Sequence, residues 1–150
     1  MTEKSFKYWV IAIFTAINSF LGLLSVPVYI MVGANITDYV TGVMASHYRG
    51  EEIKSYIGVR GIAKKIGLWV LVLVGYGLDI MIAFATENMG VSIPLKCLVS
   101  LAVVLWIICN EFISIIENLA DIGTQTPTFL IELIKFLKGK TEGASESFKE

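Results

Sequence analysis

The side chains best able to do chemistry in this sequence are acidic and stand in apolar surroundings. Four carboxylates fall within or beside long uncharged stretches: Asp38, Asp79, Glu111 and Glu117. Carboxylates act as metal ligands or as general acids and bases, and both uses require several groups to converge on one point. No second Asp follows Asp38 closely, as an acidic metal motif would require. The sequence therefore predicts neither a metal site nor a bound cofactor.

Other signatures of catalysis are missing from the sequence. His47 is the only histidine, and its place between an apolar segment and a charged stretch favours a solvated residue. The sequence has no His-Glu-x-x-His pair, no Gly-x-Ser-x-Gly elbow and no phosphate-binding glycine-rich loop. We therefore predict that the protein is not an enzyme.

Polar residues in the apolar stretches follow helical spacing instead. The last long apolar stretch carries a polar stripe, formed by Asn110, Glu111, Ser114, Glu117 and Asn118. An earlier stretch has a face of small and polar residues, formed by Ala34, Asp38, Thr41 and Ala45, with Gly42 beside it. A charge near mid-membrane costs about 2.5–3.5 kcal/mol, so it normally faces protein or water. Small residues let two helices approach closely in lipid.

Two uses of these polar faces follow. They can meet in an oligomer or line a water-filled lesion, or they can hydrogen-bond within one chain and fix its helix packing. For Asp38 and Thr41 the second use is favoured, whereas both uses stay open for the polar stripe. Asp79 lies close in sequence to a polar turn at residues 87–90, so it can also sit near the outer surface without a partner.

The amino-acid composition indicates whether water or lipid surrounds these helices. The chain has 150 residues, of which 55% are hydrophobic and 17% are charged. Soluble domains have about 25% charged residues, and a short chain that folded in water would expose much of this apolar surface. The composition therefore predicts an all-α integral membrane protein.

The apolar runs predict about four membrane spans, with three as the alternative. Residues 8–37 carry no charge, which is long for one crossing, and Ser25-Val26-Pro27 suggests a break. The predicted helices are residues 8–24, 28–46, 65–85 and 91–119, with a loop at 47–64, Pro94 in the first turn of the last helix, and a stop at Gly123 and Pro127. The alternative has one long tilted first span.

Basic residues predict the orientation. Four spans with both termini in the cytoplasm place eleven of the twelve Lys and Arg residues inside, and three spans place nine inside. Arg60, Lys64 and Lys65 precede the third predicted span, where we expect them to set topology at the membrane surface. Lys64 and Lys65 are adjacent, so one can reach lipid while the other faces protein.

The C-terminal part, residues 126–150, is predicted to be separate from the membrane domain at 1–125. Thr126-Pro127 is typical of a helix start. Apolar residues then recur at helical spacing, at Phe129, Leu130, Leu133, Ile134 and Leu137. We expect an amphipathic helix at the inner membrane surface or against another subunit. After Gly139 the tail is small and charged, and we expect disorder.

Several motifs together resemble the toxin-secretion/phage-lysis holin family. They are Asp38-Tyr-Val-Thr-Gly-Val-Met-Ala, Ser55-x-x-Gly58, Arg60-Gly-Ile-Ala-Lys-Lys-Ile66, Leu78-Asp79 and Asn110-Glu-Phe-Ile-Ser-Ile-Ile-Glu-Asn-Leu119, followed by Gly123 and Pro127. Each motif is weak singly, and their order and spacing are specific. The C-terminal tail departs from the family, because it is weakly charged with Lys and Glu mixed.

The resemblance implies a protein without an active site. Such proteins accumulate in the bacterial cytoplasmic membrane, form homo-oligomers among the membrane lipids, and open lesions. An endolysin or a large toxin, the functional partner, then crosses without needing direct contact, and no nucleic acid is involved. The rival interpretation is a non-lytic membrane scaffold or a small transporter subunit. A transporter is expected to show repeated halves and broken helices, and the sequence shows no internal repeat.

Overall fold

The computed structural model describes residues 3–50, 55–90 and 97–146. All regular structure in these ranges is helical. Its elements are α1 (Glu3–Leu21), the short 3-10 helix η1 (Gly22–Leu24), α2 (Ser25–Tyr48), α3 (Ser55–Asn88), α4 (Leu98–Asp121) and α5 (Thr128–Glu146). The predicted all-α class is confirmed.

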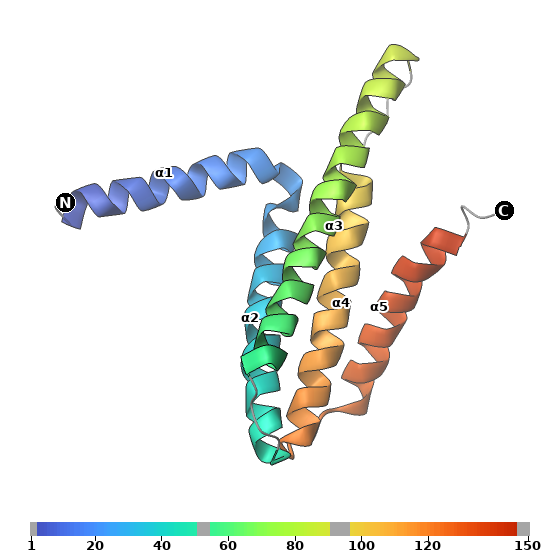
Figure 1. Ribbon diagram of the computed structural model, residues 1–150. Coiled ribbons are helices and arrows are strands. Elements are labelled where there is room, and N and C mark those ends of the chain that lie inside the picture. The colour runs from blue at the N-terminus through green and yellow to red at the C-terminus, as the bar shows by residue number, and fades with distance from the viewer. Residues whose placement is uncertain (1–2, 51–54, 91–96, 147–150) are drawn as a thin grey trace.

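Three long helices run side by side and form the body of the molecule. Figure 1 shows α2, α3 and α4 as a bundle, with α5 beside α4 and α1 projecting as an arm. The core of the bundle lies between α2 and α4, where Met31, Val104 and Ile107 are fully buried. Helix α4 is the central element, because it packs against α2, α3 and α5.

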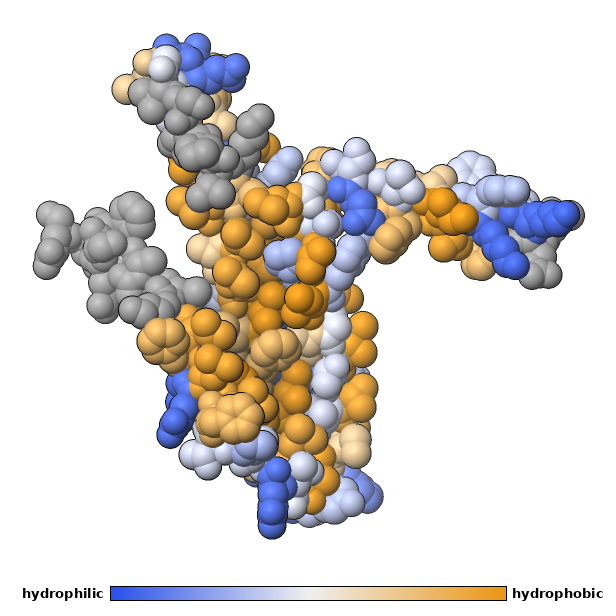
Figure 2. Space-filling view, turned by 180° about the vertical axis from the view of Figure 1, so that it is seen from behind, coloured by the Kyte–Doolittle hydropathy of each residue, from blue (hydrophilic) through white to orange (hydrophobic). Residues whose placement is uncertain are grey.

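The outer surface of the bundle is apolar. Ile66, Leu73 and Ile80 on α3 are more than half exposed, and Figure 2 shows hydrophobic side chains over much of the visible face. Exposed apolar surface of this extent is expected where lipid is the solvent. In the described ranges three segments are long and apolar enough to cross a membrane: Lys4–Tyr48, Gly61–Asn88 and Leu98–Asp121. The segment Lys4–Tyr48 contains both α1 and α2, so the first two of the four predicted helices lie in one apolar segment.

The predicted break in the first apolar run exists, but another residue makes it. Gly22 has a φ of 51°, a conformation that glycine adopts readily and other residues rarely do. The chain turns there, and α1 leaves α2 at a steep angle (Figure 1). Pro27 lies in the first turn of α2, where proline is tolerated.

Two segments predicted to be irregular are helical. The predicted loop at 47–64 is wrong for residues 55–64, because α3 begins at Ser55. This segment contains Ile, Ala, Lys and Arg, which tolerate helix well, and the cost of its glycines is spread over a 34-residue helix. The disorder predicted after Gly139 is also wrong as far as Glu146, because the Lys, Glu and Ala residues of this segment favour helix.

The ends of the other helices lie close to their predicted places. Helix α3 continues through Asn88, so the turn predicted at residues 87–90 begins two residues later than expected. It ends at Gly90, which has a φ of 70°. The predicted first turn of the last span, with Pro94, lies outside the described residues. Helix α4 ends before Gly123, whose φ is 91°, and the Thr124 N–H donates to the Leu119 carbonyl at 2.9 Å. This is the Schellman arrangement that a C-terminal glycine favours.

Candidate functional site

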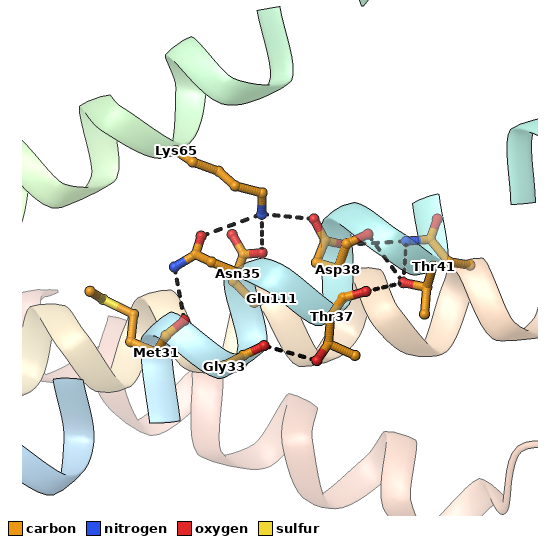
Figure 3. Close-up of polar contacts among 9 residues, drawn as sticks. Met31, Gly33, Asn35, Thr37, Asp38, Thr41, Lys65 and Glu111 are labelled. Carbon is orange, nitrogen blue, oxygen red and sulfur yellow. Dashed lines mark hydrogen bonds and ion pairs between the residues drawn. The ribbon is translucent and has the colours of Figure 1, made fainter. Parts of the chain in front are cut away.

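A lysine from α3 meets acidic and amide groups from α2 and α4 inside the bundle. Lys65 Nζ donates to Asp38 Oδ2 at 2.8 Å and to Asn35 Oδ1 at 3.3 Å, and it also pairs with the Glu111 carboxylate. Figure 3 shows the Lys65 side chain reaching from its helix to these three groups. We call Asn35, Asp38, Lys65 and Glu111 the ionic cluster.

The ionic cluster is largely shielded from solvent. The exposed fractions of its charged side chains are 18% for Lys65, 16% for Asp38 and 8% for Glu111. Charges in such surroundings require partners, because removing one partner of a buried pair costs about 3–5 kcal/mol. The cluster therefore holds three membrane helices in one register.

A second polar contact extends the ionic cluster along the interface between α2 and α4. Asn118 Nδ2 donates to Asp38 Oδ1 and to Thr41 Oγ1, both at 3.2 Å. The Thr41 hydroxyl donates in turn to the Thr37 carbonyl, at 2.9 Å. Gly42 lies beside this amide, and a Cβ built there would make an ordinary contact of 3.6 Å with Asn118 Nδ2. The small and polar face predicted on α2 thus packs against the polar stripe of α4.

Asp79 forms a separate polar contact at the opposite end of α4. Its carboxylate accepts the backbone N–H of Val99 and of Ser100, each at 2.8 Å, and the Ser100 hydroxyl at 2.6 Å. These donors belong to the first turn of α4, where the N–H groups have no partner within the helix. Asp79 is buried, so the expectation that it needs no partner near the surface is wrong.

The approach of α3 to the start of α4 depends on a glycine. A Cβ built at Gly75 would stand 3.1 Å from Ser100 Cα, which is closer than an ordinary contact. One turn along α3 from Gly75, Asp79 is then in reach of the backbone of α4. The carboxylate also offsets the partial positive charge of a helix N-terminus.

A cavity of about 400 Å³ lies between α3 and α4 beside the ionic cluster. Lys64, Asn110, Ser114 and Glu117 line it together with Asp38, Lys65 and Glu111, and apolar residues such as Trp106 and Leu68 complete the wall. The remaining members of the predicted polar stripe therefore face this cavity. Asn110 also donates to the Trp106 carbonyl at 3.0 Å.

The structure thus distributes the predicted residues over three places. The contact between α2 and α4 brings together Asp38, Thr41, Gly42, Glu111 and Asn118. The cavity is bordered by Asn110, Ser114, Glu117 and Lys64, and Asp79 caps α4. The side chain of Arg60 lies outside the described part of the structure. Sequence reasoning missed Asn35 and placed Lys65 at the membrane surface. The available signal was that Asn35 precedes Asp38 by three residues and so shares its face.

Among the residues that the structure describes, no three His, Cys, Asp or Glu side chains are grouped to hold a metal ion. The arrangement instead consists of paired charges and hydrogen bonds, which position helices.

Comparisons with known proteins agree with this description of a membrane bundle. The sequence model of the bacteriophage holin family matches residues 15–139. An uncharacterized protein of Halalkalibacterium halodurans is 33% identical, with 87% of this chain and 93% of that protein aligned. An uncharacterized protein of Listeria innocua is 32% identical, over 89% of this chain and 87% of the relative. A probable holin of Bacillus phage phi105 is 26% identical over 78% of each chain. No solved structure matches the chain. The family match covers most of the sequence, and the chain therefore belongs to the bacteriophage holin family.

Proposed function

We propose that this chain is a holin that oligomerises in the bacterial cytoplasmic membrane and opens lesions large enough for an endolysin or a large toxin to cross. The family membership supports the holin role. The observation that supports the mechanism is the ionic cluster. It keeps charged and amide side chains inside a bundle whose outer surface is apolar.

The apolar exterior and the polar residues that border the cavity have different roles in this proposal. The apolar exterior keeps single chains soluble in lipid. When chains assemble, the polar residues of α4 that border the cavity, Ser114 and Glu117 among them, exchange contacts with a neighbouring copy or with water. Polar contacts between membrane helices contribute only about 0.6 kcal/mol each on average. Assembly therefore depends strongly on the amount of protein in the membrane, and mass action sets the time of opening.

The orientation that fits this role places the basic end of the bundle in the cytoplasm. Arg49 follows α2, and Lys64 and Lys65 lie in the first half of α3, close to the same end of the bundle. Positive charge concentrates on the cytoplasmic side of membrane proteins. The turn between α4 and α5 is then on the cytoplasmic side.

The test is to induce the chain in bacteria and to record membrane potential, viability and the amount of protein in the membrane over time. A second culture also produces a cytoplasmic endolysin, and a third produces an unrelated three-span protein at the same level. We expect an abrupt loss of potential and viability with the chain alone, and cell-wall degradation only when the endolysin is present.

Normal accumulation without depolarisation would contradict a lytic role and would favour the scaffold or transporter-subunit interpretation. Depolarisation without passage of the endolysin would limit the lesion to ions. Replacing the endolysin with a large secreted toxin, in otherwise identical cultures, measures whether the lesion also serves toxin release.

A further inference from the structure

Helix α1 has one apolar side and one polar side, although most of it lies in the uncharged stretch at residues 8–37. At 100° per residue, nine apolar residues gather on one side of the helix: Phe6, Trp9, Val10, Ile13, Phe14, Ala16, Ile17, Phe20 and Leu21. The other side carries Lys4, Lys7 and Asn18 together with small and hydroxyl residues, and its one large aliphatic residue is Ile11. A helix that crosses lipid alone needs apolar residues on all sides, whereas this pattern is typical of a helix at a membrane surface.

The apolar face of α1 is mostly uncovered by the rest of the chain. Trp9 is 62% exposed and Phe20 is 70% exposed. Two rings of this face contact the bundle: Phe14 stacks on Tyr29 with centroids 5.4 Å apart, and Phe20 lies against Tyr76 at 5.8 Å. Because Tyr29 and Tyr76 belong to α2 and α3, the apolar face is turned toward the membrane-spanning helices.

The direction of α1 identifies what covers this face. Figure 1 shows α1 running across the direction of the bundle, at the end where α2 and α4 begin. A helix that lies across spanning helices lies along the membrane plane. In Figure 2 the arm ends in hydrophilic residues and shows hydrophobic residues between its tip and the bundle. Its apolar face therefore meets the acyl chains that surround the spans.

We propose that α1 is an in-plane helix of the outer leaflet, that its apolar face binds lipid, and that the N-terminus lies outside the cell, opposite the end of the bundle where α2 ends and α3 begins. This placement replaces the expectation that both termini are cytoplasmic, which requires α1 to cross. It is independent of lesion formation, because it follows from one chain. The basic majority of the chain still lies inside, since only Lys4, Lys7 and Lys96 are then outside.

The first test measures the depth of three residues on the apolar face. Phe6, Ile13 and Phe20 are spaced seven residues apart, and each is replaced by Trp in a chain whose Trp9, Trp69 and Trp106 are changed to Phe. The purified chain is reconstituted in phospholipid vesicles, and quenching by lipids labelled at different depths locates each ring. We expect the same depth at all three positions.

A spanning α1 would instead place Ile13→Trp about 10 Å deeper than the other two, because seven residues of helix rise that far. Such a profile would overturn the proposal. The matched control uses Ile66, Leu73 and Ile80 of α3, which are exposed and have the same spacing. This set must show the deep middle position, which confirms that the vesicles hold an inserted bundle.

The second test measures the side on which the N-terminus lies. Ser5→Cys is introduced after Cys97 and Cys109 are replaced by Ala, and cells are treated with a membrane-impermeant maleimide before any depolarisation. We expect labelling in intact cells and none in sealed inverted vesicles, with His47→Cys at the opposite end of the bundle showing the reverse. Labelling of Ser5→Cys only in inverted vesicles would show that α1 crosses the membrane. Protection on both sides would place Ser5 inside the lipid and would also overturn the proposed surface position of α1.

Discussion

At the scale of single residues, Lys65 is a side chain of α3 that bonds to both α2 and α4. Its ammonium group is the donor to Asp38, Asn35 and Glu111, whereas the adjacent Lys64 is exposed. Two neighbouring lysines thus have unlike environments because consecutive residues on a helix point in different directions. Their substitutions should therefore have unlike effects.

We predict that Lys65→Met destabilises the folded bundle by about 3–5 kcal/mol, because it leaves two buried carboxylates without their cation. Lys64→Met is the matched control and should change stability by less than about 0.5 kcal/mol. Unfolding in detergent micelles, together with the amount of chain in the membrane, measures both effects. Equal losses for the two variants would contradict the importance of the cluster.

A charge-free version of the cluster separates lost charge pairing from lost packing. Replacing Lys65 by Met together with Asp38 and Glu111 by Leu should recover most of the stability lost in the single variant. Apolar residues of similar size often replace a buried ion pair at no cost. The same unfolding measurement applies. A triple variant less stable than Lys65→Met would show that lost charge pairing does not cause the destabilisation of the single variant.

At the scale of helices, the bundle depends on how closely α3 can approach α4. Asp79 reaches the first N–H groups of α4 because Gly75 lets the two backbones come together. The contact fixes where α4 begins relative to α3, and α4 also packs against α2. A change at this contact is therefore expected to act on the whole interface.

We expect Asp79→Leu to weaken the start of α4 by about 1–3 kcal/mol, because buried N–H groups lose their acceptors. Asp79→Asn keeps one acceptor and should lose less. Hydrogen exchange at Val99 and Ser100 measures the effect directly. Unchanged exchange at these amides in Asp79→Leu would mean that another group caps the helix.

Gly75→Ala should also destabilise the bundle, by about 1–3 kcal/mol, because the added Cβ meets the backbone of Ser100. Gly77→Ala is the control, since a Cβ built there meets no atom of the described residues within 4 Å. We expect this control to be neutral or to stabilise by up to about 1 kcal/mol through helix propensity. Thermal unfolding in micelles compares the two, and a Gly75 variant as stable as the control would show that the helices adjust.

Sequence patterns predict these helices better than they predict the contacts between them. Long apolar runs and the glycine at position 123 were enough for the helices and for the end of α4. The start of α3 was missed because charged residues in a helix look like a loop when their partners are unknown. The ionic cluster was missed because Lys65 and Glu111 are 46 residues apart, and only the packing of α3 on α4 brings them together.

At the scale of the whole molecule, polar contacts inside the chain compete with contacts between chains. Asn118 bonds to Asp38 and Thr41 within one chain, so these groups are available to a neighbour only after the α2–α4 contact changes. The ease of that change is expected to set how much protein accumulates before the membrane opens.

We predict that Asn118→Leu keeps normal insertion, since a more apolar helix inserts at least as well, but shifts the onset of depolarisation. Losing two hydrogen bonds of about 0.5–1.5 kcal/mol each loosens the α2–α4 contact and should bring opening forward. Glu117→Leu, at the cavity and outside the ionic cluster, is the comparison. A potential-sensitive dye and quantitative blotting provide the measurement. If the Asn118 variant depolarises at the same time as the wild type, the contact of Asn118 with Asp38 and Thr41 has no role in opening.

The ionic cluster also has a consequence for biosynthesis. Asp38 and Lys65 are synthesised 27 residues apart, and the Glu111 that completes their contacts is made 46 residues after Lys65. Until α4 is made, a nascent chain can form the Asp38–Lys65 pair but lacks the contacts to Glu111 and Asn118 that complete it. Chains truncated before α4 should be recognised by membrane quality-control proteases, so that only complete copies accumulate.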